Sequence, residues 1–136
     1  MNKKNQIVFL GRKIGLTFTE ILIVVVIMGV LVTMAFPMLI KTIEQAKVDE
    51  AIANLNLIRT GQKIYFLEGS TFSPTIEDLY VENPNDMAEG FYDYSMVSSS
   101  TSDFTARASR KDNAPSPYKD FYYDISKDGT ITPYEE

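Results

Sequence analysis

An apolar run from Leu16 to Ile40, with Glu20 as its one charged residue, constrains this chain more than any other feature. A helix of this length and composition spans the roughly 30 Å of hydrocarbon in a bilayer. A carboxylate at the centre of a bilayer costs about 2.5–3.5 kcal/mol on insertion scales, so such a residue is usually functional. The run is therefore predicted to be a membrane-spanning helix that carries one functional acid.

Charge is distributed unevenly on the two sides of this run. The first 15 residues contain four basic side chains and no acid, whereas the remainder contains nine basic and eighteen acidic side chains. A basic segment before an apolar span predicts a cytoplasmic N-terminus, which places the following region outside the inner membrane. Because an acidic region repels phosphates, nucleic acid is not an expected partner.

The 136-residue chain has no cysteine and no histidine. A disulfide is therefore excluded, and the commonest metal ligand and general base is missing. The sequence shows no nucleophile–base pair, phosphate-binding loop or metal cluster. It predicts neither an enzyme nor a bound cofactor, and the region after the span is expected to form one small domain.

Three interpretations compete for residues 1–40. A secretory signal peptide has a short apolar core and a small-residue cleavage site, whereas this run is long and has no such site. An ordinary single-span anchor accounts for everything except Gly15 and Glu20. The third interpretation accounts for both residues.

Gly15, Leu16 and Glu20 resemble the N-terminal motif of type IV pilins and the related pseudopilins, and the resemblance covers roughly residues 12–60. In that family a basic leader ends in glycine, a prepilin peptidase cuts directly after it, and the new N-terminal residue is methylated. The fifth mature residue is glutamate. The resemblance assigns these roles to Gly15, Leu16 and Glu20, and matches the family's helix-interior glycine and proline with Gly29 and Pro37.

Two positions depart from the family pattern. Leu16 stands where phenylalanine or methionine is usual, and Leu57 stands where many major pilins have a second proline. The first change is conservative, and the second predicts a straighter lower helix or a different filament rise.

The charge and position of Glu20 also suggest a chemical role without the family resemblance. Cleavage before Leu16 creates an α-amine, and in a bundle of helices this amine can meet Glu20 of a neighbouring copy. A low dielectric makes an unpaired charge costly, so the pair would fix the register between copies. Pairing within one chain, or a carboxylate that reaches the membrane interface, are the alternatives.

The helix is predicted to continue over residues 41–68 with one apolar stripe. The stripe contains Val48, Ala51, Ile52, Leu55, Ile58 and Tyr65, and the charged residues Lys41, Glu44, Lys47, Asp49, Glu50 and Arg59 are expected largely off it. Gly69 is expected at C′, ending the helix near Leu67 or Glu68, and Gly61 could bend it. Heptads are not sustained enough for a long coiled coil.

The remaining residues, 69–136, read as a small β-sheet region. Strands are expected at Phe91–Val97, Phe104–Ser109, Phe121–Ser126 and Thr130–Tyr134, the last two joined by a two-residue turn at Asp128-Gly129. A short helical turn is expected at Ser73–Asp78, with loops at Asn83–Asp86 and 111–119. The expected fold is α+β and pilin-like: one long N-terminal helix with a small antiparallel sheet packed on its C-terminal half. Its parts are a leader (1–15), a membrane or filament-core helix (16–40), an amphipathic continuation (41–68) and the sheet region (69–136).

Two patterns in the sheet region resemble binding sites. Asp124, Ser126, Asp128, Gly129 and Glu135 have a spacing similar to a calcium loop, but a hairpin explains Asp128-Gly129, and Pro133 argues against the helix that should follow. Arg107, Arg110 and Lys111 form a basic cluster that could contact DNA. Acidic neighbours in a filament are the favoured partner for this cluster.

The resemblance implies a structural subunit of a type IV pilus that polymerises with itself. Its other expected partners are the prepilin peptidase and N-methyltransferase, a pilus assembly platform and the inner membrane before assembly. The mature subunit is expected in an extracellular filament. A pseudopilin of a type II secretion system is the alternative, and a plain membrane-anchored binding module is a third possibility.

Overall fold

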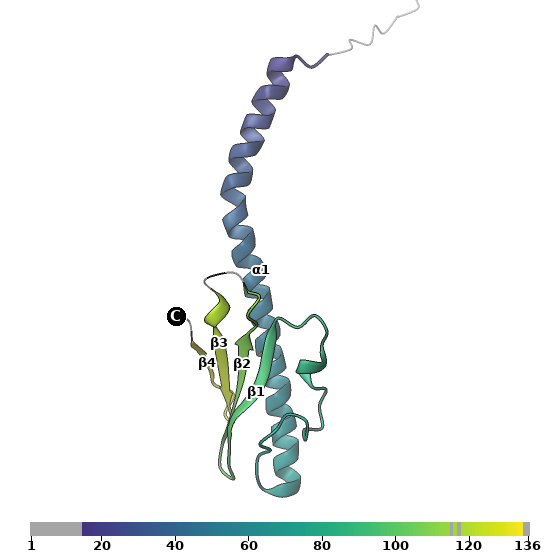
Figure 1. Cartoon of the computed structure of the whole chain (residues 1–136), viewed down its shortest axis with the longest axis vertical. Helices are drawn as coiled ribbons and strands as arrows, with labels where there is room; N and C mark the ends of the chain where they lie inside the picture. The colour runs from purple at the N-terminus through teal and green to yellow at the C-terminus, as the bar shows by residue number, and fades with distance from the viewer. Residues whose placement is uncertain (1–14, 115, 117, 135–136) are drawn as a thin grey trace, which may run out of the picture. The chain divides into compact units, whose positions relative to one another are not determined.

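The computed structural model describes residues 15–114, 116 and 118–134. They form one long helix, two short 3-10 helices and four strands (Figure 1). The chain divides into two compact units, with the boundary between Lys41 and Thr42, and each unit is described separately. Most of the predicted leader, residues 1–14, lies outside the described residues.

Helix α1 runs without interruption from Phe18 to Gly69, a length of 52 residues, which confirms the prediction of one long helix. In the first unit every described side chain, from residue 15 to 41, is exposed. This part of α1 is long and apolar enough to cross a membrane by length and composition. The helix continues through both Gly29 and Pro37.

The second unit contains a four-stranded antiparallel sheet with the strand order β1-β2-β3-β4 (Figure 1). Its strands are β1 (Tyr92–Ser99), β2 (Phe104–Arg110), β3 (Tyr122–Ser126) and β4 (Ile131–Tyr134). All four predicted strands are present, with shifted ends, and the register of β1 on β2 shifts between Met96 and Ser98. The α+β fold class is therefore confirmed.

The core of the second unit lies between α1 and one face of this sheet. Ala51, Leu55 and Ile58 of the predicted helix stripe are fully buried. On β2, the alternating residues Phe104, Ala106 and Ala108 face the same core. Small side chains on this strand let the helix approach the sheet closely, and the alternation of residues 104–109 in the sequence places them on one face. The buried aromatic and aliphatic residues around them are Phe72, Ile76, Leu79, Tyr92, Tyr94, Tyr123 and Ile125.

The two helix glycines of the second unit have different roles from those expected. Gly69 is the last helical residue and not C′, because Ser70 adopts the left-handed conformation with φ 54°. Gly61 is buried within continuous helix, and a Cβ atom there would lie 3.0 Å from Val81 Cγ2. A close approach of the connection after α1, and not a bend, therefore favours glycine at position 61.

The connection from α1 to β1 contains no α-helix. At Ser73–Asp78 the chain makes a turn in which Thr75 N–H donates to Ser73 Oγ at 3.2 Å, and Leu79 N–H donates to Ile76 O at 3.0 Å. The Ser-Pro pattern thus forms a local serine turn that satisfies backbone groups without a helix.

Both predicted loops contain 3-10 helices. The first is η1 (Pro84–Asp86), which Asn83 caps by accepting from Asn85 N–H. The second is η2 (Tyr118–Asp120). Pro115 and Pro117, which were expected to shape the second loop, lie outside the described residues.

The turn between β3 and β4 has three residues instead of the expected two. Ile125 pairs with Ile131, Gly129 N–H donates to Ser126 O at 3.0 Å, and Ser126 N–H donates to Thr130 O at 3.3 Å. Within this turn only Gly129 has a positive φ, 94°. Gly129 is therefore the last residue of a three-residue turn and does not form a central pair with Asp128. This is the usual arrangement when a hairpin loop ends in a left-handed glycine.

Candidate assembly site

The start of α1 forms a reciprocal cap. Glu20 N–H donates to Thr17 Oγ1 at 3.2 Å, while Thr17 N–H and Thr17 Oγ1 each donate to Glu20 Oε2 at 2.8 Å. This is a capping box, in which Thr17 is the N-cap and Glu20 is the third helical residue. Sequence reasoning missed it, although a threonine three positions before a glutamate at the start of an apolar run is its known signal.

The cap leaves much of the Glu20 carboxylate unused. Both hydrogen bonds end on Oε2, so Oε1 remains available to a partner. The carboxylate also lies in the first turn of α1, where it opposes the partial positive charge of the helix N-terminus. Glu20 is exposed, as are Gly15 and Leu16 beside it.

The five predicted processing and assembly positions do not form one cluster. Gly29 and Pro37 lie about 13 and 25 Å beyond Glu20 along the helix, from a rise of 1.5 Å per residue. A Cβ atom on Gly29 would contact nothing within 4 Å. Gly29 therefore leaves an open notch on the helix surface, a feature that allows close contact between membrane helices.

A buried ion pair ties the sheet of the second unit to α1. Arg110 Nη2 lies 3.1 Å from Glu44 Oε2, and the two side chains are only 2% and 7% exposed. Arg110 Nη1 also donates to Phe91 O at 2.8 Å, and Lys47 Nζ lies 2.6 Å from Glu44 Oε1. The expectation that Glu44 lies off the buried face was therefore wrong, because its partner on β2 was not visible from the helix pattern.

The predicted basic cluster is divided between the faces of the sheet. Arg110 points into the core, whereas Arg107 binds Asp124 with two hydrogen bonds of 2.7 and 2.8 Å. Lys111 lies 3.7 Å from Asp93. Strand alternation separates the two arginines, and each of the three bases has an acidic partner within the second unit. They do not form a shared surface for nucleic acid.

The calcium-like pattern forms part of the hairpin. Asp124 is occupied by Arg107, and Asp128 Oδ1 accepts from Ser126 Oγ at 2.6 Å and from Thr130 N–H at 2.9 Å. These donors lower the pKa of Asp128 to about 2. Glu135 lies outside the described residues, within which no group of three or more acidic, histidine or cysteine side chains could hold a metal ion.

Comparisons with known proteins extend this description. No family model matches the sequence. The chain is similar to the type IV major pilin protein PilA of Myxococcus xanthus strain DK1622, with 40% identity over 65 residues. The aligned segment covers 48% of this chain and 30% of that protein. The chain is therefore similar, over about half of its length, to part of a type IV major pilin, and its long apolar helix with an antiparallel sheet is a pilin-like α+β arrangement.

Proposed function

We propose that this protein is a structural subunit of a type IV pilus. It is made as a prepilin, cleaved after Gly15, N-methylated at Leu16 and polymerised through its apolar N-terminal helix. The observation that carries the proposal is the helix surface of the first unit, which is apolar and exposed around its whole circumference. Such a role is structural and requires no catalytic site.

Two environments can cover this surface. Fully burying one large aliphatic side chain contributes about 1.5–3 kcal/mol, so a helix with many exposed ones is stable only in lipid or against other apolar helices. Before assembly the helix crosses the inner membrane once, with its N-terminus in the cytoplasm. After extraction by a pilus assembly platform, copies of the same helix cover it in the filament core.

Glu20 restricts the register in which helices can pack in the filament core. In a core of packed helices, Oε1 of Glu20 pairs with the α-amine that cleavage creates on Leu16 of a neighbouring copy. An uncompensated buried charge costs about 3–5 kcal/mol when its partner is missing, so only registers that join the two groups are stable. Thr17 donates to Oε2 and so holds the Glu20 carboxylate at the start of the helix, while Oε1 makes this contact.

Shearing filaments from the source cells, followed by intact-mass and N-terminal peptide analysis, tests the proposal. We expect an abundant peptide that begins at methylated Leu16 in the sheared fraction. The same peptide confined to the membrane fraction would favour the pseudopilin alternative or a scarce minor subunit. An intact Met1 terminus would overturn cleavage and leave an anchored binding module.

A further inference from the structure

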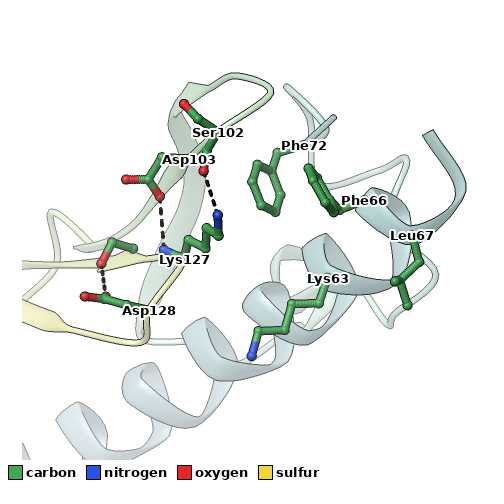
Figure 2. A pocket seen from close by; sticks show the side chains of 9 residues that line it. Lys63, Phe66, Leu67, Phe72, Ser102, Asp103, Lys127 and Asp128 are labelled. Atoms are coloured by element: carbon green, nitrogen blue, oxygen red, sulfur yellow. Dashed lines mark hydrogen bonds between the residues drawn. The ribbon is translucent and has the colours of Figure 1, made fainter. Parts of the chain in front are cut away.

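A groove with a volume of about 730 Å³ lies at the C-terminal end of α1 (Figure 2). One side is formed by Lys63, Phe66 and Leu67 of the helix, with Phe72 beside them. The other side is formed by the turns that follow β1 and β3. All of these residues belong to the second unit.

The helix side of the groove combines apolar side chains with Lys63. The rings of Phe66 and Phe72 stack with their centroids 4.7 Å apart, and Leu67 is 84% exposed. Phe66 is half-buried and Phe72 is buried, so the apolar surface that this side offers to a partner comes mainly from Leu67 and Phe66. The groove therefore favours a partner that presents an apolar side chain.

The charged groups of the opposite side are held by internal hydrogen bonds. Lys127 Nζ donates to Ser102 O at 2.9 Å, and Asp103 Oδ1 accepts from Phe104 N–H at 2.8 Å. Asp128 is occupied by Ser126 and Thr130, as described above. Lys63, by contrast, is exposed, and its side chain makes no hydrogen bond or ion pair with any described residue. The uncommitted charge at the groove is therefore positive.

A surface of opposite character lies at the other end of β1. The segment from Asp86 to Phe91 presents Met87, 40% exposed, and Phe91, 39% exposed, together with the exposed carboxylates of Asp86 and Glu89. Residues 86–93 contain three acids and no base, and the nearby Lys111 lies 3.7 Å from Asp93. We call residues 86–91 the acidic loop.

The acidic loop and the groove cannot meet within one subunit. The loop precedes β1 and the groove follows it, and the eight residues of this strand separate them by about 27 Å, from a rise of 3.4 Å per residue. Head-to-tail association of identical copies brings opposite ends of a subunit together and can repeat into a filament. Apolar and charged groups of the two surfaces then match.

We propose that the acidic loop of one copy docks in the groove of the next, with Met87 against Leu67 and Phe66, and Glu89 near Lys63. The proposal rests on the proposed function, because it describes a contact between subunits of the filament. It adds a second contact, between globular units, to the helix bundle.

Disulfide trapping in filaments tests this contact, because the chain has no cysteine of its own. A full-length Leu67→Cys/Met87→Cys variant should give a ladder of multimers on non-reducing gels of oxidised, sheared filaments. The matched control, Leu67→Cys/Ser95→Cys, carries its second cysteine on an exposed position of β1 outside both surfaces. We expect about tenfold more multimers for the first pair, since a disulfide requires Cα atoms within about 7 Å.

Three outcomes would overturn the contact. Equal ladders from both pairs would indicate random collision, and dimers from Leu67→Cys alone would mean that two grooves face each other. Filaments without a ladder would remove the contact and leave the pilus function intact. If the unaltered chain, which contains no cysteine, gave no filaments, both the pilus function and this contact would be contradicted.

Charge reversal gives an independent test. Lys63→Glu should reduce the filament yield several-fold, and Glu89→Lys in the same chain should restore it, because like charges in contact repel. Lys119→Glu, a change at an exposed lysine outside the groove, is the matched control and should leave the yield unchanged. Loss in the single variant without rescue in the double variant would point to another occupant of the groove.

Discussion

Arg59 of α1 lies directly against Gly129 of the β3–β4 turn. A Cβ atom on Gly129 would be 2.9 Å from the guanidinium carbon of Arg59, and the φ of Gly129 is 94°. In this position Arg59 donates to Lys127 O at 3.0 Å and to Asp128 O at 2.9 Å. A single helix side chain therefore binds the tip of the last hairpin, and glycine is required for it to do so.

We expect Gly129→Ala to destabilise the second unit by about 1–3 kcal/mol, through backbone strain and the displacement of Arg59. Urea unfolding of the full-length chain in detergent measures the free energy of unfolding, with the near-UV circular dichroism of its tyrosines as the signal. Gly90→Ala is the control, because a Cβ atom there would have its nearest contact at 3.6 Å and its φ is not positive. Equal effects of the two changes would contradict this account of Gly129.

The ion pair of Glu44 and Arg110 leads to a second prediction. Glu44→Ala should cost about 3–5 kcal/mol, because it leaves the Arg110 charge buried without its carboxylate. Glu44→Leu/Arg110→Met, which removes both charges, should recover most of this loss. The same urea measurement distinguishes the two variants.

Arg107→Ala is the comparison for this pair. Arg107 and Asp124 are 31% and 22% exposed, so water can reach the carboxylate that Arg107→Ala leaves behind, and this change should cost less than Glu44→Ala. A loss from Glu44→Ala as small as that from Arg107→Ala would show that Glu44 is not structurally important.

Much of the fold could be predicted because its causes are local in sequence. The 3.6-residue period identified Ala51, Leu55 and Ile58, and strand alternation identified Ala106 and Ala108. Both patterns record which side of an element faces the core. The capping box of Thr17 and Glu20 was equally local and was overlooked.

The remaining errors came from contacts between distant residues. Glu44 is buried because Arg110, 66 positions later, reaches it, and a helix pattern contains no information on that partner. Gly61 is favoured because Val81 packs closely on it from the following connection. The Asp128-Gly129 pair fits both a two-residue and a three-residue turn, and the register of Ile125 with Ile131 decides between them.

Asp128 makes the hairpin sensitive to acid. Its pKa falls from an ordinary value of 3.8 to about 2, because Ser126 Oγ and Thr130 N–H donate to its charged form. A lowered pKa contributes stability above pH 3.8, and this contribution is lost as the pH falls towards 2. We expect the urea midpoint to decrease over this interval, and to decrease less in Asp128→Ala.

Asp112→Asn is the control for this acid step, because Asp112 is exposed and makes no side-chain hydrogen bond within the described residues. It should retain the full decrease. If Asp128→Ala showed the same pH dependence as the unaltered chain, the step would arise from other carboxylates.

The two functions assigned to Glu20, capping the helix and pairing with the Leu16 amine, can be separated by substitution. Glu20→Gln keeps an oxygen that can accept from Thr17 but removes the charge, whereas Thr17→Ala removes the cap and keeps the charge. If the charge fixes the register between copies, Glu20→Gln should abolish filaments and leave cleavage after Gly15 intact. Thr17→Ala should cost about 0.5–2 kcal/mol of helix stability and still give filaments.

Filament yield in the sheared fraction, with the mass of the membrane-bound subunit as a check on cleavage, distinguishes the two. Normal filaments from Glu20→Gln, with few from Thr17→Ala, would assign the assembly function to the cap instead of the charge.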